Sequence, residues 1–358
     1  MNKVQVIQFG IGNVGRALIR KVLDYNDHNR ECQIAYLGIV NSSSFIFNNY
    51  GIDNVLLSKL ISSEKSQSFE ELPGAENHNG NLNIVIAAID KEATENICIV
   101  DVTNSTDTLP ILLESATRGY KLVLANKKPL VQEMLVFEQL KKATLGCRAT
   151  VGAGLPVIEV LKSILDKNQK IIGIEGCLSG TLGTLCSALE KGNKFSKEVI
   201  DSIEKGYTEP DPREDLAGID VARKILIISR FCGYNLGIDD VNVEKLFPDK
   251  IKDLTIEDFI RQLTTLDLGY KNRFESALAN NTTWRYVATL ENNKCYVGLK
   301  NVPIESEIGK LVGADKVVIF FTDKNPRKPI VIKGKGAGPE NAAQDVLDDI
   351  IEVSNLEE

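Results

Sequence analysis

The feature that most constrains the fold is a glycine-rich hexapeptide, GIGNVG, near the start of the chain. It consists of Gly10, Ile11, Gly12, Asn13, Val14 and Gly15. An apolar run precedes it and an amphipathic stretch with helical spacing follows, which predicts a strand–loop–helix unit. In such a unit the first glycine permits a tight turn, the second lets the backbone approach a pyrophosphate, and the third lets helix and strand pack closely. The hexapeptide therefore predicts a dinucleotide site, against the alternative of a tight turn that binds nothing.

Short apolar runs alternate with helical patterns through the first 147 residues, which predicts a parallel sheet with right-handed crossovers. The predicted strands are 4–9, 33–40, 84–88, 97–101 and 121–125, and a helix is expected at about 108–118. Residues 148–330 instead mix helices, one at about 215–231, with strands such as WRYVATL. This pattern predicts an α+β domain with an open antiparallel sheet. The last segment, 331–358, reads as a strand, a glycine-rich turn and a helix.

Composition narrows the class of protein. The 358 residues carry a formal charge of -7 without a lysine- or arginine-rich run, so nucleic acid is not an expected partner. Seven cysteines without a C-x-x-C pair argue against a disulfide framework or a zinc site and suit a reducing compartment. No apolar run has the length of a membrane span and no signal peptide is recognised, so a cytoplasmic protein is expected. His28 and His78 lie in polar stretches and are expected to be solvated loop residues.

The end of the second strand bears on the choice of cofactor. An acid about 20 residues past the glycines would hold the ribose 2′-hydroxyl of NAD. Here the strand ends at Val40 and is followed by Asn41, Ser42 and two more serines. No carboxylate in this stretch would repel a 2′-phosphate, so the sequence favours NADP and leaves NAD possible.

The most informative stretch is GYTEPDPREDLAGIDVARK, residues 206–224. Its continuation is apolar nearly all round, which predicts a buried helix. Asp220 and Lys224 are four residues apart and so share one helical face. A charged pair there indicates either a structural ion pair or a site, and the sequence leaves both open. Of the acids upstream, Asp211 and Glu214 are expected to be solvated residues at a helix start.

A second lysine candidate follows a predicted parallel strand. Lys127 lies in the sequence ANKKP, directly after the strand at 121–125. Ligands of parallel sheets bind beyond the carboxyl ends of the strands, so Lys127 is expected to face the nicotinamide side of the crevice. Lys128 is expected to be a surface turn residue.

Taken together, these motifs resemble the homoserine dehydrogenase family. The match runs in order through GIGNVG, DVTNS, LANKKPL, TVGAGLPVIEVL, IEGCLSGTLGTL, the 206–224 stretch and GKGAGPENAAQDVL. It looks closest to the dehydrogenase half of the bifunctional aspartokinase–homoserine dehydrogenases, without the kinase half. The resemblance implies a Rossmann domain at 1–147 joined by 331–358, a substrate-binding and dimerisation domain at 148–330, and a homodimer.

The resemblance also implies an activity and roles for residues. The implied reaction is the reversible NAD(P)H-dependent reduction of L-aspartate 4-semialdehyde to L-homoserine, in threonine, methionine and isoleucine biosynthesis. The implied catalytic residues are Lys224, Lys127 and Asp220. The implied substrate-binding residues are Glu209, Asp215, Gly206 and Thr181. The implied cofactor contacts, besides residues 10–15, are Asn41, Ser42, Thr103, Asn104, Lys127 and Gly338.

Two positions depart from the family pattern. The resemblance implies a sodium or potassium site at the backbone carbonyls of Val151, Ala153 and Leu155. The family usually has an acid three positions before the valine, where this chain has Arg148. An arginine there weakens the expectation of a bound cation. Asn341 also replaces a threonine of the C-terminal motif.

Two other readings compete with this one. An aspartate-semialdehyde-type dehydrogenase would need a nucleophilic cysteine beside a histidine, and no such pair is apparent. A non-enzymatic NADPH-binding regulator would not need Lys127, Glu209, Asp220 and Lys224 together.

Overall fold

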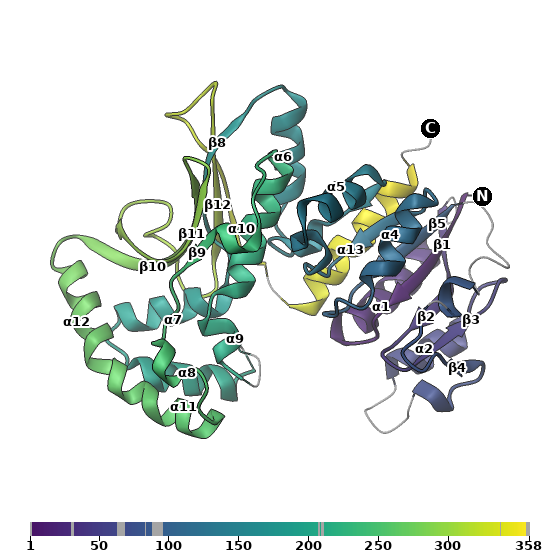
Figure 1. Ribbon diagram of the computed structural model, residues 1–358, viewed down its shortest axis with the longest axis horizontal. Coiled ribbons are helices and arrows are strands. Elements are labelled where there is room, and N and C mark those ends of the chain that lie inside the picture. The colour runs from purple at the N-terminus through teal and green to yellow at the C-terminus, as the bar shows by residue number, and fades with distance from the viewer. Residues whose placement is uncertain are drawn as a thin grey trace. The chain divides into compact units, whose positions relative to one another are not determined.

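The computed structural model describes residues 2–29, 32–62, 69–82, 84–87, 96–206, 208, 211–336 and 338–355. The chain divides into two compact units, one of residues 1–154 with 337–358 and one of residues 155–336 (Figure 1). The expected boundaries lay at 147 and 330. The strand at the second boundary pairs with the sheet of the second unit, because its backbone bonds to the strand at 316–322.

The first unit contains a seven-stranded sheet in the order β4-β3-β2-β1-β5-β6-β7. Its strands are β1 (Asn2–Phe9), β2 (Cys32–Val40), β3 (Ser44–Phe47), β4 (Ala75–Asn77), β5 (Ile97–Asp101), β6 (Lys121–Leu124) and β7 (Leu145–Gly146). The strands β2, β1, β5, β6 and β7 are parallel, while β3 and β4 extend the sheet antiparallel. Every residue of β5 and β6 is buried, as expected of parallel strands covered on both faces. The predicted Rossmann-type α/β sheet is confirmed.

Five helices of the first unit have defined bounds: α1 (Asn13–His28), α2 (Asn54–Ser62), α4 (Leu109–Thr117), α5 (Met134–Lys142) and α13 (Pro339–Asn355). The C-terminal helix α13 packs against α1, so the two ends of the chain share one hydrophobic core. One predicted strand is wrong, because residues 84–87 are helical. A short apolar run of that length does not by itself distinguish a strand from a buried helical turn.

The second unit contains a six-stranded sheet in the order β13-β12-β8-β10-β11-β9. Its strands are β8 (Ile171–Cys177), β9 (Val241–Val243), β10 (Thr282–Glu291), β11 (Lys294–Pro303), β12 (Lys316–Thr322) and β13 (Ile330–Gly334). All neighbours are antiparallel except β9 and β11. The predicted open antiparallel sheet is therefore confirmed, with one short parallel strand at its edge.

The helices of the second unit are α6 (Val157–Asp166), α7 (Gly180–Glu190), α8 (Phe195–Glu204), α9 (Arg213–Leu216), α10 (Ile219–Phe231), α11 (Ile256–Leu263) and α12 (Asp267–Leu278). The single helix expected at 215–231 is two helices, α9 and α10. The break is at Gly218, which has a left-handed φ of 70°. A β-carbon at this position would lie 1.9 Å from the Tyr286 hydroxyl, so a glycine is required where the chain turns. Within the described ranges, no helix combines the length and apolar character needed to cross a membrane.

Candidate active site

The glycine hexapeptide has the geometry that its spacing predicts. Gly10 has a φ of 104°, and its amide donates to the Val40 carbonyl at 2.8 Å, which fixes the turn. A β-carbon on Gly15 would lie 2.3 Å from the Gly10 carbonyl oxygen, so only a glycine lets α1 pack this close. A β-carbon on Gly12 would meet nothing within 4 Å. The loop is therefore closed on its protein side and open at Gly12, where an incoming pyrophosphate would approach the N-terminus of α1.

A buried glutamine supports this loop, and sequence reasoning missed it. Gln8 is fully buried in β1, and its amide donates to the Gly10 carbonyl at 2.8 Å and to the Gly15 carbonyl at 3.3 Å. The Tyr36 hydroxyl donates to the Gln8 side-chain oxygen at 3.0 Å. Both ends of the loop are thus hydrogen-bonded to one side chain. The available signal was a polar residue inside the otherwise apolar end of a predicted strand.

The predicted ribose-binding segment after β2 is an ordered turn. The Asn41 side-chain oxygen accepts from the amides of Ser43 and Ser44 at 2.8 and 2.6 Å. His78 is 1% exposed, so its expected place in a solvated loop is wrong. Its Nε2 lies 3.1 Å from the Asn41 carbonyl oxygen, while its Nδ1 accepts from the Gly80 amide at 3.2 Å. This pattern requires a proton on Nε2, so His78 donates to Asn41 and supports the turn.

A carboxylate reaches this turn from elsewhere in the sequence. The Ser43 hydroxyl donates to Glu70 at 2.5 Å. Glu70 lies in a 3₁₀ turn, Phe69–Glu71, well beyond the stretch that was searched for an acid. An acid beside the ribose favours a 2′-hydroxyl and disfavours a 2′-phosphate. Glu70 therefore weakens the sequence argument for NADP, which considered only residues 41–44.

A fully buried carboxylate joins the ends of β5 and β6. Asp101 accepts from the Thr103 amide at 2.9 Å and from the Thr103 and Thr108 hydroxyls, both at 2.7 Å. It also accepts from the Asn126 side-chain amide at 2.9 Å. Four hydrogen-bond donors thus replace the water that burial removes from this carboxylate. Sequence reasoning quoted both motifs but assigned neither Asp101 nor Asn126 a role.

The Asp101 network brings several predicted cofactor contacts together. A β-carbon on Gly10 would lie 3.1 Å from the Thr103 methyl group, so the hexapeptide touches this loop. The Lys128 ammonium donates to the Asn104 carbonyl at 2.6 Å, and Lys127 lies directly after Asn126. Lys127 is therefore carried on a turn whose neighbours on both sides are fixed by hydrogen bonds.

In the second unit, Lys224 is held by two partners. Its ammonium lies 2.7 Å from an Asp220 carboxylate oxygen and donates to the Leu178 carbonyl at 2.9 Å. The Lys224 side chain is 13% exposed and that of Asp220 is 45% exposed. The expectation of a pair buried inside the helix is thus wrong for Asp220, because the first turn of α10 is partly open and the fully buried part begins at Ile225.

The other predicted substrate residues lie on neighbouring elements, since α9 contacts both α7 and α10. Leu178 follows β8 and leads into α7, whose first turn contains Thr181. Asp215 lies in α9, and its backbone carbonyl accepts a hydrogen bond from the Gly218 amide at 3.0 Å. Gly206 has a φ of 67° and ends the turn after α8. Glu209 lies outside the described residues.

An arginine at the start of α9 joins Asp211 to the segment at 252–254. Arg213 donates to the Asp211 carboxylate at 2.6 Å and to the carbonyls of Lys252 and Leu254 at 2.8 and 2.7 Å. The hydrogen bonds from Arg213 lower the pKa of Asp211. Asp211 therefore orients Arg213, while its side chain stays 31% exposed, in keeping with the expected solvated position. The Thr208 hydroxyl is buried and has no hydrogen-bond partner among the described residues.

The implied cation site lacks the side-chain ligand that the family pattern places at position 148. Val151 and Ala153 belong to the first unit, and Leu155 begins the second, where its carbonyl accepts from the Val157 amide at 2.7 Å. Arg148 offers hydrogen-bond donors and a positive charge, not an oxygen ligand. No group of three or more histidine, cysteine or acidic side chains suited to a metal occurs among the described residues.

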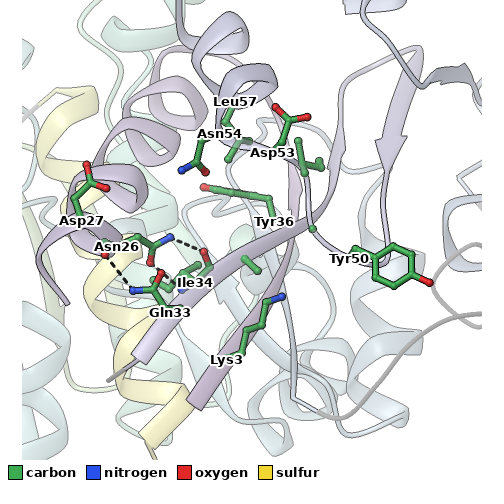
Figure 2. Close-up of a pocket in the computed structure, with 13 residues that line it drawn as sticks. Lys3, Asn26, Asp27, Gln33, Ile34, Tyr36, Tyr50, Asp53, Asn54 and Leu57 are labelled. Carbon is green, nitrogen blue, oxygen red and sulfur yellow. Dashed lines mark hydrogen bonds between the residues drawn. The ribbon is translucent and has the colours of Figure 1, made fainter. Parts of the chain in front are cut away.

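A surface groove of about 330 Å³ lies elsewhere in the first unit. Figure 2 shows the Asn26 side chain on one side of the groove, hydrogen-bonded to the backbone of Ile34. Tyr36 and Asn54 lie on another side. The groove is lined by the beginnings of β1 and β2, at Lys3 and Gln33, whereas the glycine loop follows the end of β1. It is therefore separate from the predicted cofactor site.

Comparisons with known proteins identify the family of the chain. The family model described as "Homoserine dehydrogenase" matches residues 156–351, more than half of the chain. A maize chloroplastic bifunctional aspartokinase/homoserine dehydrogenase 2 is 29% identical over 97% of this chain, which spans 38% of the maize protein. The chain thus spans about two fifths of the length of such curated relatives.

Two solved structures share the fold over nearly the whole chain. A protein of unknown function from Candida auris has a TM-score of 0.87 and 27% identity, covering 99% of this chain and 98% of its own. A hyperthermophilic archaeal homoserine dehydrogenase, solved in complex with NADPH, has a TM-score of 0.74 and 20% identity, covering 98% of this chain and 97% of its own. With the family model matching most of the second unit and α13, the chain belongs to the homoserine dehydrogenase family.

Proposed function

We propose that this chain is an NADP(H)-dependent homoserine dehydrogenase that interconverts L-aspartate 4-semialdehyde and L-homoserine. The observation that carries the proposal is Lys224, held between the Asp220 carboxylate and the Leu178 carbonyl in the family's most distinctive stretch. Such a lysine keeps a fixed direction while retaining protons that it can donate. The names of the curated relatives, which are longer proteins, support the same activity.

In the proposed mechanism, the nicotinamide supplies or accepts the hydride when it is bound. The protein binds the amino acid and moves a proton. Lys224 donates a proton to the aldehyde oxygen as alkoxide character develops, and in the reverse direction a neutral lysine removes the hydroxyl proton. Asp220 fixes the ammonium of Lys224, and Lys127 assists from the nucleotide-binding unit. We assign Glu209 and Asp215 to the substrate ammonium, with Gly206 and Thr181 lining the site.

The proposed cofactor is NADP(H), with the pyrophosphate at Gly12 and the N-terminus of α1. The absence of an acid in residues 41–44 supports this choice, as does the NADPH complex of the archaeal structural neighbour. Ile11, Asn13, Val14, Asn41, Ser42, Thr103, Asn104 and Gly338 are the further proposed contacts. Glu70 beside Ser43 supports measurable use of NAD(H) as well.

The proposed oligomer is a homodimer formed through the second unit. Its sheet ends in β13, an outer strand on which Val331 is 40% exposed. An outer strand presents backbone groups that a second copy can pair with. Light scattering coupled to size-exclusion chromatography tests whether the chain is a dimer. The proposed compartment is the cytoplasm.

The test of the proposed activity is cofactor consumption by the purified chain. We expect NADPH absorbance to fall with L-aspartate 4-semialdehyde, and NADPH to form from L-homoserine and NADP. A protein that binds NADPH yet turns over neither substrate would instead be the regulator. Acyl-phosphate formation dependent on inorganic phosphate would indicate the cysteine chemistry of the other alternative.

A further inference from the structure

One face of the C-terminal helix α13 carries a row of carboxylates. Asp345, Asp349 and Glu352 are separated by four and three residues, which places them on one side of the helix. Asp345 is 8% exposed and Asp349 is 1% exposed. Carboxylates buried this deeply need hydrogen-bond donors or a cation to stay ionised.

The segment 146–154 supplies those partners. The Gly154 amide donates to Asp345 at 2.8 Å, and the Arg148 amide donates to Asp349 at 2.9 Å. The Arg148 guanidinium then spans two carboxylates. One of its nitrogens lies 2.7 Å from Asp349, and another is paired with Glu352.

The segment lies directly against the helix. A β-carbon on Gly146 would be 2.6 Å from the Asp349 β-carbon, and one on Gly154 would be 3.2 Å from the Asn341 β-carbon. Asn341, which replaces the family's threonine, therefore packs against this segment. The backbone of 146–154 is thus held along the length of α13 by direct contacts.

We propose that the Arg148 guanidinium takes the place of a bound cation in this segment. The backbone of residues 148–155 then keeps its conformation without sodium or potassium. An acid at position 148 would add a negative charge beside Asp349 and would call for a bound cation. Arginine reduces that need, because its single positive charge lies between Asp349 and Glu352 and its nitrogens bond to both. The monovalent cation implied by the family pattern is then dispensable here, whatever reaction the protein catalyses.

The first test compares the melting temperature of the wild-type chain in sodium, potassium and N-methylglucamine chloride at one ionic strength. The proposal predicts the same Tm within about 1 °C in all three salts, since none of them binds specifically. A Tm at least about 3 °C higher in sodium or potassium than in N-methylglucamine would overturn it.

The second test removes the guanidinium. Arg148→Met should lower the Tm by about 10 °C, because it leaves two carboxylates, one fully buried, without their cation. Arg148→Lys should recover about half of that loss, since lysine retains the charge but lacks the planar guanidinium whose separate nitrogens bond to the two carboxylates. The matched control is Lys300→Met, which breaks an ion pair of 2.5 Å with Glu175 whose side chains are 40% and 30% exposed. That change should lower the Tm by only about 2 °C or less. An Arg148→Met protein as stable as the Lys300→Met control would contradict the proposal.

Discussion

The glycine-loop end of the first unit and the surroundings of Lys224 in the second are built in different ways. In the first unit, the side chains of Gln8 and Asp101 are hydrogen-bonded to other protein groups. A β-carbon on Gly12 would meet no atom within 4 Å, so the backbone there is accessible. In the second unit, the Lys224 ammonium contacts the Asp220 carboxylate on the same helix and the Leu178 carbonyl. The first arrangement suits binding and the second suits proton transfer. Changes at the two ends should therefore separate affinity and stability from turnover.

The largest expected effect is on turnover, at Lys224. Lys224→Ala should lower kcat by about a hundredfold or more, because it removes the proposed proton donor. The KM for NADPH and the Tm should change little, since the lysine lies outside the nucleotide-binding unit. Steady-state kinetics and thermal unfolding measure all three. Lys300→Ala in the same unit is the control, and its kcat should remain that of the wild type.

Asp101 should show the largest effect on stability. Asp101→Asn presents an amide where four donors converge, so it should lower the free energy of unfolding by about 2–4 kcal/mol. Urea unfolding measures the loss. Asp107→Asn, at an exposed carboxylate in the same loop region, should stay within about 0.5 kcal/mol of the wild type. Equal losses in the two variants would show that the Asp101 network is not the anchor that its contacts indicate.

Gln8 should affect cofactor affinity more than turnover. Gln8→Leu removes both donors that hold the glycine loop, and we expect NADPH to bind about tenfold more weakly. Tyr36→Phe removes only the hydrogen bond that orients Gln8, so about threefold is expected. Titration of NADPH fluorescence gives both dissociation constants. A Gln8→Leu protein that binds NADPH with normal affinity but has a reduced kcat would show that Gln8 supports turnover and not cofactor binding.

Glu70 should set the ratio between the two cofactors. Glu70→Gln removes a negative charge beside Ser43, and kcat/KM for NADPH relative to NADH should rise about fivefold. The change should come from NADPH, because a 2′-phosphate is what the carboxylate repels. Parallel assays with NADPH and NADH measure kcat/KM for each cofactor. An increase in kcat/KM confined to NADH would show that the ribose does not bind beside Glu70.

The smallest effect is expected from thiol modification. Burial raises the pKa of Cys98 to about 12 and that of Cys186 to about 11, so neither is a thiolate at neutral pH. Iodoacetamide at pH 7 should therefore leave the rate of NADPH oxidation unchanged. Rapid loss of activity that substrate prevents would favour the nucleophilic-cysteine chemistry instead.

The sequence predicted those features that depend on local spacing. The glycine loop and the contact between Asp220 and Lys224 follow from residues close together in the chain, and the structure shows both. The features that were missed join distant segments. His78 is buried against Asn41, and Glu70 reaches Ser43, across stretches whose polar composition indicated only loops.

Polar residues inside apolar strands were the overlooked signal. Gln8 and Asp101 stand at the carboxyl ends of β1 and β5, where ligands of parallel sheets bind. Their burial marks them as supports of the site, but their partners could not be read from spacing. Arg148 shows the same limit, because its partners on α13 lie about 200 positions away along the chain.

The central claim is that Lys224 transfers the proton, and chemical rescue tests it most directly. Lys224→Cys should have lost nearly all turnover of L-aspartate 4-semialdehyde while still binding NADPH. Aminoethylation of the new thiol restores an ammonium at almost the same distance from the backbone, and turnover should return by at least about tenfold. Wild-type protein treated in parallel should not gain activity. A Lys224→Cys protein that is active before treatment, or that stays inactive after complete aminoethylation, would contradict the account.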